Sequence, residues 1–318
     1  MVNALEESIF RRGIMRGQST MKKNKFLQNY QLYLMLLPTI IFIFIFCYIP
    51  MYGVLMAFQD YTPSAGIWGS EWVGFDHFTR FITNFRFEEL LSNTFILSFV
   101  GFLVGFPLPI LLALMINALT NRRFQGFVKT VLYAPHFISV VVLVGMLYIF
   151  FGEYGLVNSI IQAFGGESIS FFLEKSWFRP LFIGSGNWQD MGWSAIIYLA
   201  ALAGVDPQVH EAAIVDGATR WQRILHVDLP AIFPTVSVML ILSIGSIMGV
   251  GHEKVLLMQT GANLGVSEII STYVYKAGLI DYDYGYAAAI GLFNSVINVV
   301  LLVFANRMAK KFSENSLW

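Results

Sequence analysis

The sequence has little charge and a single cysteine. Cys47 is the only cysteine of the 318 residues, so no disulfide can form within the chain. Only 13% of the residues are charged, against about 25% in soluble domains. The net charge is zero, which argues against nucleic acid as a partner. The composition therefore excludes an ordinary soluble domain.

The motifs of several catalytic centres are also missing. No Gly-x-x-x-x-Gly-Lys-Ser/Thr loop occurs, so we expect the chain to bind no ATP by itself. No Gly-x-Ser-x-Gly elbow is present. The five histidines are scattered and form no cluster with metal-ligand spacing. We expect no catalytic residue, no metal and no cofactor in this chain, which makes a membrane enzyme a remote alternative.

Apolar residues dominate what is there. They make up 56% of the chain, and the mean hydropathy is +0.64. Charge-free apolar windows of about 20 residues can each cross a bilayer as a helix. The sequence thus predicts an all-α integral membrane protein with six transmembrane helices, near residues 32–56, 93–119, 130–151, 186–205, 231–250 and 285–306. The fourth window is the weakest, because Asn187, Gln189 and Asp190 lie near its start.

The basic residues predict the orientation of these helices. Fourteen of the 20 lysines and arginines lie in residues 1–31, 120–129, 206–230 and the C-terminal tail, and six lie in the longer alternate connections. Basic connections stay in the cytoplasm. Both termini and the 206–230 loop should therefore be cytoplasmic. We divide the chain into a basic tail at 1–31 and a transmembrane domain at 32–318.

Proline and glycine mark special places in the predicted helices. Pro107 and Pro109 each remove a backbone donor, so the second helix should kink or break there. Gly101 with Gly105, and Gly245 with Gly249, have Gly-x-x-x-Gly spacing, which permits close helix contact. Packing within the chain explains these spacings more simply than a seam between subunits.

The 206–230 loop is the longest strongly polar stretch in the second half of the chain. Asp206 followed by Pro207 predicts the start of a helix. Gly217 can adopt a left-handed conformation and end that helix. A second short helix should follow, capped by Asp216 and anchored by Trp221. On these signals alone, the loop could be an ordinary helical hairpin between two membrane helices.

The same stretch resembles the Glu-Ala-Ala loop of permeases from ATP-binding-cassette (ABC) importers. The matching residues are Glu211-Ala212-Ala213, Gly217 and Val227-Asp228-Leu229-Pro230, with Val227 where that family has Ile. Asp216, Ala218 and Trp221 extend the match to the carbohydrate-uptake branch, which includes the membrane subunits of the maltose transporter. In that family the loop is the coupling helix that docks on a cytoplasmic ATPase. The resemblance assigns ATPase coupling to Glu211, Ala212, Ala213, Asp216, Gly217, Ala218 and Trp221.

The last third of the chain is similar to the lipoprotein-linked polysaccharide permeases. The stretches 251–258, 273–275, 288–295 and 316–318 carry this likeness. His252 departs from it, because Phe is expected before Glu253-Lys254. The resemblance implies import of oligosaccharides, which could derive from alginate or pectin. It implies a second homologous permease, two ATPase subunits that bind ATP and Mg²⁺, and an extracytoplasmic solute-binding protein, all at the bacterial cytoplasmic membrane.

Polar and aromatic residues near the predicted helices are candidates for a sugar path. Sugars need hydrogen-bonding groups and aromatic faces, and buried polar groups in membrane helices face protein or water. The candidates are Tyr133, Asn187, Trp188, Asp190 and Asn294. Each could equally serve in helix packing or in the interfacial aromatic belt. A channel or secondary transporter that works without ATP is the alternative function, and Asp190 would be its one deep ionisable group.

Overall fold

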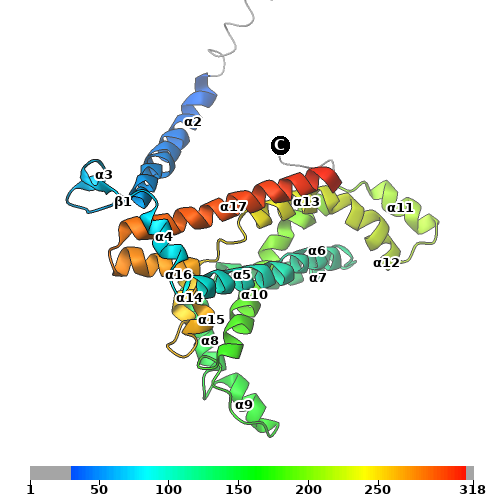
Figure 1. The fold of residues 1–318 in the computed structure, drawn as a ribbon. Coiled ribbons are helices and arrows are strands. Elements are labelled where there is room, and N and C mark those ends of the chain that lie inside the picture. Colours follow the sequence, from blue (N-terminus) through cyan, green and yellow to red (C-terminus); the bar gives the residue numbers. More distant parts are fainter. Residues whose placement is uncertain (1–29, 313–318) are drawn as a thin grey trace, which may run out of the picture. The chain divides into compact units, whose positions relative to one another are not determined.

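The computed structural model describes residues 30–312 (Figure 1). The predicted tail at 1–31, apart from its last two residues, lies outside the described part, as does the 316–318 match. The chain divides into two units, Met1–Leu55 and Met56–Trp318, which we describe separately.

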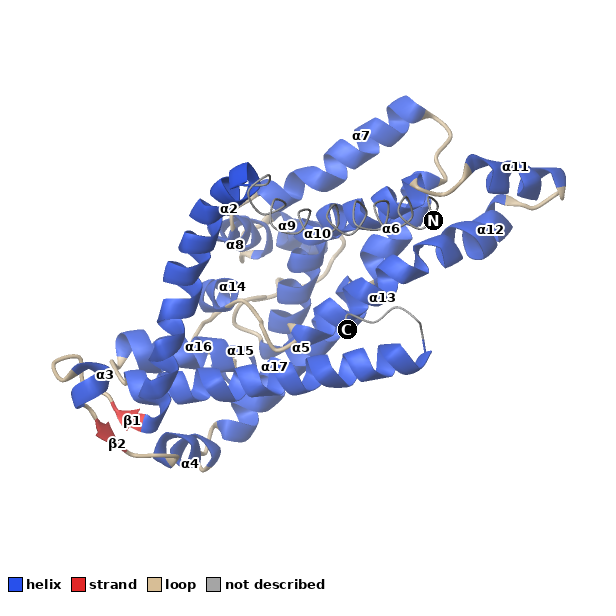
Figure 2. Ribbon diagram, turned by 90° about the horizontal axis from the view of Figure 1, so that it is seen from above, coloured by secondary structure: helices blue, strands red, loops and turns tan. Residues whose placement is uncertain are grey.

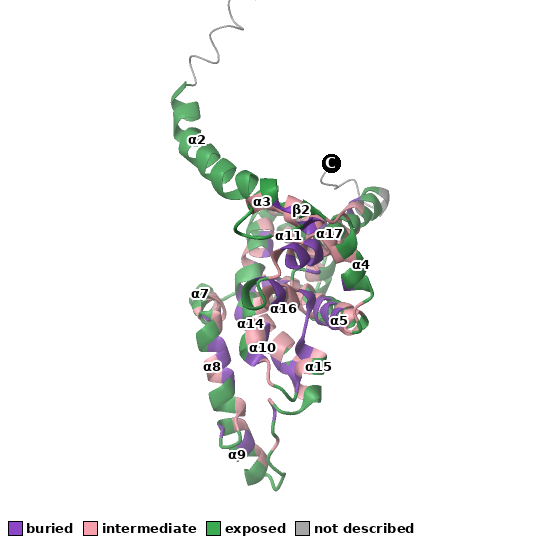
Figure 3. Ribbon diagram, turned by 60° about the vertical axis from the view of Figure 1, so that its left-hand side comes forward, coloured by how far each residue is buried: buried purple, intermediate pink, exposed green. Residues whose placement is uncertain are grey.

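The described part of the first unit is one continuous run of helical turns. It consists of α2 (Tyr30–Ile43), a π-helical turn (Phe44–Tyr48) and the beginning of a 3₁₀ segment (Ile49–Phe58). None of the residues in α2 or the π-helical turn is buried, as the exposed colouring of α2 in Figure 3 shows. Residues 30–58 carry no charge and are long enough to cross a bilayer, in agreement with the first predicted span.

The second unit begins with a small β-ribbon and a short helix. Strands β1 (Gln59–Asp60) and β2 (Glu71–Trp72) pair antiparallel on either side of α3 (Gly66–Gly69). Helix α4 (Asp76–Ile82) follows. This ribbon is the one departure from the predicted all-helical class within residues 30–312.

Prolines divide the next helices. Helix α5 (Phe87–Gly105) ends where α6 (Pro107–Asn117) begins, which confirms the predicted break. The predicted span at 130–151 was wrong at its start, because α7 (Arg122–Tyr133) and a 3₁₀ turn (Ala134–Phe137) precede α8 (Val140–Phe151). Pro135 lies in that turn, and the hydroxyl of Ser139 caps α8 by accepting the Val142 N–H at 3.3 Å.

The remaining helices complete the second unit. They are α9 (Leu156–Ala163), α10 (Lys175–Ala203), α11 (Pro207–Val215), α12 (Arg220–Arg223), a π-helical turn (Ile224–Asp228), α13 (Leu229–Gly245), α14 (His252–Met258), α15 (Leu264–Ser267), α16 (Ile270–Tyr275), a second π-helical turn (Lys276–Ile280) and α17 (Tyr284–Phe312). Figures 1 and 2 show α11 and α12 at one end of this unit and α4 and α16 at the other.

Five helical segments within residues 30–312 are long and apolar enough to cross a membrane. These are Tyr30–Phe58, Phe87–Asn117, Val140–Ala163, Arg220–Gly245 and Tyr284–Met308. The predicted span at 186–205 overlaps α10 up to the end of that helix at Ala203; α10 has 29 residues but is not one of the five. Its polar side chains, among them Asn187, Gln189 and Asp190, explain the difference.

Helix α10 contributes to two of the three buried clusters that form the core. Ala195, Tyr198 and Leu202 of α10 pack with α6 and α13. Another part of α10 packs with α5, α8 and α14. A third cluster joins α4, α5, α16 and α17. Close helix contact accompanies these clusters: a Cβ on Gly245 would lie 2.6 Å from Leu302 of α17, so this glycine serves packing within the chain.

Candidate functional site: an exposed helical hairpin and a polar cavity

The residues that begin and end α11 do so through local backbone chemistry. The carboxylate of Asp206 accepts a hydrogen bond from the Gln208 N–H at 2.9 Å, and Pro207 is the first helical residue. Gly217 follows the helix with a φ of +77°, which favours glycine. Both predictions for this helix are confirmed.

The start of α12 differs from the prediction. Thr219, not Asp216, is its N-cap: the Thr219 hydroxyl accepts the Gln222 N–H at 3.3 Å, and the Gln222 side chain accepts the Thr219 N–H at 2.7 Å. Asp216 lies three residues too early, at the C-terminal end of α11. We call residues 206–228 the coupling hairpin, and it runs without interruption into α13.

The coupling hairpin leaves most of its apolar side chains exposed. No residue of α11 is buried, and Val215 is 86% exposed. Trp221 is 72% exposed, so it does not anchor α12 within this chain as predicted. Glu211, Ala212, Asp216 and Gly217 are exposed, and Ala213 and Ala218 are half-buried. A shallow pocket of about 260 Å³ lies between the two helices and is lined in part by Ala213, Gly217 and Ala218. Exposed apolar surface of this kind indicates contact with another protein.

A buried carboxylate ties the hairpin to the membrane helices. Asp228 is 4% exposed. One of its oxygens lies 3.2 Å from Nε2 of His210 and accepts a hydrogen bond from the Asn117 amide at 3.3 Å. The contact joins α11, the turn before α13 and the end of α6. The position of His210 in the sequence gives no sign of this partner.

A polar cavity of about 390 Å³ lies between α5, α10 and the residues that lead into α14. Asn187 and Asp190, two of the candidates for a sugar path, line it. Trp188 lines a different, apolar cavity of about 380 Å³. Tyr133 and Asn294 do not line the polar cavity, and the Asn294 amide instead donates to the Met248 carbonyl at 3.5 Å. The structure therefore brings together two of the five candidates.

Further residues complete the surroundings of this cavity. Lys254 of α14 also lines it. The sequence did not single out Lys254 as a candidate, although the 251–258 stretch that contains it carries the family resemblance. An oxygen of the Asp190 carboxylate lies 2.9 Å from Nδ1 of His136. The His136 ring in turn stacks on Trp193 with ring centroids 4.5 Å apart.

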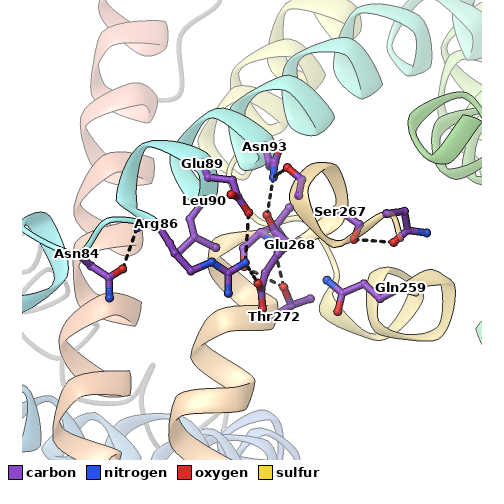
Figure 4. A network of polar contacts seen from close by, with 12 residues as sticks. Asn84, Arg86, Glu89, Leu90, Asn93, Gln259, Ser267, Glu268 and Thr272 are labelled. Carbon is purple, nitrogen blue, oxygen red and sulfur yellow. Dashed lines mark hydrogen bonds and ion pairs between the residues drawn. The ribbon is translucent and has the colours of Figure 1, made fainter. Parts of the chain in front are cut away.

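A buried ion network holds the α14–α17 connection against α5 (Figure 4). The Glu268 side chain is 1% exposed and pairs with Arg86, and with Lys276 at 2.7 Å. The Asn93 amide donates to the carbonyls of Gly265 and Glu268, both at 3.0 Å. Because both basic partners neutralise it, the buried Glu268 carboxylate can fix the position of the α14–α17 connection.

Comparison with known proteins places the chain in a family. Residues 105–314 match the model of the family described as "binding-protein-dependent transport system inner membrane component". The chain is 46% identical over 295 residues to the polygalacturonan/rhamnogalacturonan transport system permease protein YteP of Bacillus subtilis, covering 92% of each chain. It is 44% identical to the protein LplB of the same organism, covering 90% of this chain and 91% of LplB.

Solved structures of ABC transporters are also similar to this chain. A chain from a bacterial ABC transporter involved in the import of the acidic polysaccharide alginate is 40% identical, with a TM-score of 0.82, and covers 90% of this chain and 97% of that one. A chain from the alginate transporter in complex with an alginate pentasaccharide-bound periplasmic protein is 39% identical, with a TM-score of 0.84, and covers 92% and 98%.

The chain belongs to this family of inner membrane transport components. It is a permease subunit of an ABC transporter, a translocation component and not an enzyme. This membership supports ATP-driven transport over the gradient-driven alternative. The coupling hairpin, with its Glu-Ala-Ala sequence, agrees with that family.

Proposed function

We propose that this chain is one of two homologous permease subunits of a bacterial importer that moves oligosaccharides inward across the cytoplasmic membrane. Two copies of a separate ATPase subunit bind ATP and Mg²⁺, and an extracytoplasmic binding protein delivers the solute. The observation that carries this proposal is the coupling hairpin, a capped structure whose small and apolar side chains are exposed at one end of a permease fold.

The proposal includes six membrane spans with both termini in the cytoplasm. Helix α10 supplies the sixth, since its 29 residues suffice to cross and its polar residues line a cavity. An even number of spans puts the termini on one side. The distribution of basic residues makes that side, which also holds the coupling hairpin, cytoplasmic.

Force is transmitted through the hairpin in this proposal. The ATPase subunits close on ATP and carry α11 with them, by helix-in-groove docking. Glu211 forms a salt bridge or a cap with the ATPase, while Ala212, Ala213 and Gly217 allow close approach. The His210–Asp228 pair and the continuous helix into α13 pass this movement on. Helices α10 and α13 then rock as rigid bodies and expose the cavity alternately to each side.

The proposed cargo is an oligosaccharide with acidic sugar units, as in fragments of alginate or pectin. The likeness to YteP and to the alginate transporter supports this choice, because each is described by a polymer that contains uronic acid. Amide, hydroxyl and charged side chains lie among the apolar residues that line the cavity, and a sugar can use both kinds of surface.

Gly217→Pro and Glu211→Lys test the coupling. The φ of +77° is closed to proline, and Lys reverses the charge at the docking surface. Both variants should reach the membrane but lose co-purification of the ATPase and import of radiolabelled oligogalacturonate or oligoalginate. Gly165→Pro is the matched control, since Gly165 has a φ of +82° in a connection on the other side.

Two results would contradict the proposal. One is a Gly217→Pro subunit that retains the ATPase and imports at the normal rate. The other is uptake that survives ATP depletion and stops with a protonophore, which would restore the gradient-driven alternative.

A further inference from the structure

Lys254 places its amine in the polar cavity. The residue lies in α14, and its Nζ donates a hydrogen bond to the Phe182 carbonyl at 2.8 Å. The amine also lies 4.8 Å from the centroid of the Phe182 ring. A Cβ added to Gly186 would come within 3.1 Å of this nitrogen, so the glycine of α10 leaves room for the amine.

This amine has no carboxylate partner among residues 30–312. No Asp or Glu oxygen of the described residues lies within 4.0 Å of it. Asp190 faces it and favours its charged form, but that carboxylate is paired with His136. Burial lowers the pKa of Lys254 to about 8, so the amine remains mostly charged at neutral pH. One carbonyl uses one of its three N–H donors, and two stay available.

Two further residues that line the cavity have a buried polar atom without a partner among the residues that the structure describes. The amide nitrogen of Asn187 and the hydroxyl of Ser98 are buried, and neither has a hydrogen-bond partner in the described part of the chain. The Asn187 side chain is held close to α5, where a Cβ on Gly105 would lie 2.7 Å from its oxygen. Buried polar groups are nearly always satisfied, so unpaired ones in a cavity point to a bound solute or water.

Lys276 is a lysine with a structural role, and its partners differ from those of Lys254. Its amine, on the same connection, has the buried carboxylate of Glu268 at 2.7 Å and the Gln259 side chain at 3.2 Å. Lys254 has no comparable anion. A half-buried cation without an anion is costly unless a charged ligand supplies one, and the cavity of about 390 Å³ falls in the range of small-molecule sites.

We propose that Lys254 binds the carboxylate of a uronic acid unit while the oligosaccharide passes through the cavity, with Asn187 and Ser98 binding its hydroxyl groups. The inference rests on the proposed function. It names the residue that would distinguish an acidic from a neutral sugar in the permease, independently of what the external binding protein selects.

The test uses the whole importer, purified through a tag on this chain together with its native partners and reconstituted in vesicles. Lys254→Met removes the charge and keeps the length, Lys254→Gln is a second neutral variant, and Lys254→Arg keeps the charge. Lys175→Gln is the matched control, because Lys175 is an exposed lysine at the start of α10. The substrates are tetragalacturonate and the same oligosaccharide with its carboxyl groups reduced to alcohols.

The neutral variants should raise KM for import of tetragalacturonate about tenfold or more, as expected for loss of a charge-assisted hydrogen bond. Import of the reduced oligosaccharide should stay within about twofold, and Lys254→Arg should retain most acidic import. ATP hydrolysis stimulated by the loaded binding protein should persist in every variant.

The possible failures are distinct. If the wild-type importer moves neither tetragalacturonate nor an alginate oligosaccharide, the proposed acidic cargo is wrong. If it moves either one, and Lys254→Met moves that substrate and its reduced form like the wild type, only the role of Lys254 is overturned. Should both neutral variants fail to retain the partners while Lys254→Arg retains them, Lys254 stabilises the fold, and this also overturns the inference.

Discussion

The coupling hairpin and the 251–283 connection lie at opposite ends of the second unit and satisfy their polar groups in opposite ways. The hairpin closes its helix ends locally, through Asp206, Thr219 and Gly217, and exposes most of its side chains, with the buried Asp228 as the exception. The connection uses partners far away in sequence, such as Glu268 with Arg86, and buries them. The first region is ready for a partner protein, whereas the ion network of the second is satisfied within this chain.

The contrast separates two kinds of mutational effect. A change in the buried connection removes contacts that the folded chain itself needs, so it should lower the free energy of unfolding. A change on the exposed face of the hairpin removes few contacts within the chain, so it should impair assembly or coupling and leave the fold intact. The following predictions go from the largest expected effect on stability to the smallest.

Glu268→Ala should have the largest effect. It leaves Arg86 and Lys276 facing each other without their shared carboxylate, and breaking a buried ion pair costs about 3–5 kcal/mol. Denaturant unfolding in detergent measures the loss. Glu253→Ala, an exposed glutamate in the same connection, is the control and should change stability by less than about 0.5 kcal/mol. If Glu253→Ala lowered the free energy of unfolding as much as Glu268→Ala, the buried ion network would not be what stabilises this connection.

Asp228→Ala should have an intermediate effect, because Asp228 is the one buried carboxylate at the base of the hairpin among the described residues. His210 and Asn117 lose their common acceptor, at a cost of about 1–3 kcal/mol. The companion variant His210→Ala should import several-fold less solute per ATP hydrolysed, because α11 is then less firmly joined to α13. An unchanged import-to-hydrolysis ratio would show that this pair transmits no movement.

Thr219→Ala should have the smallest effect. It removes the N-cap of α12, worth about 1 kcal/mol. Asp216→Ala is the informative control, since the sequence had suggested Asp216 for this role and the structure gives it to Thr219. Thermal unfolding in detergent should show a lower midpoint for the threonine variant alone. A drop with Asp216→Ala instead would mean that the cap is assigned to the wrong residue.

The sequence predicted features whose cause is local. Asp206 and Gly217 delimit α11, and Pro107 breaks a helix, because caps, left-handed glycines and missing N–H donors act within a few residues. The start of the span at 130 was wrong since apolar residues continue across a 3₁₀ turn that hydropathy alone does not register. Hydropathy also could not select the residues of the sugar path, because an apolar window predicts which residues cross the bilayer but not which face of the helix they occupy.

Contacts between residues far apart in the sequence could not be predicted from local features. Nothing near Asp190 in the sequence indicates His136, and nothing near Glu268 indicates Arg86, because these pairs depend on how the helices pack. Trp188 and Asn187 are neighbours in the sequence, yet α10 directs them into different cavities. Lys254 has no such local signal for the same reason, since only the packing of α14 against α10 brings it to the cavity that Asn187 also lines.

The most direct measurement is the side of the membrane that the coupling hairpin faces. Single cysteines at Val215 and, as a control, at Tyr154 are introduced after Cys47→Ser. Both positions are highly exposed, at 86% and 92%. A membrane-impermeant maleimide should label Val215→Cys only in inverted vesicles stripped of the ATPase, with protection when the ATPase is restored, and should label Tyr154→Cys only from outside. Labelling of Val215→Cys in intact cells would contradict the account.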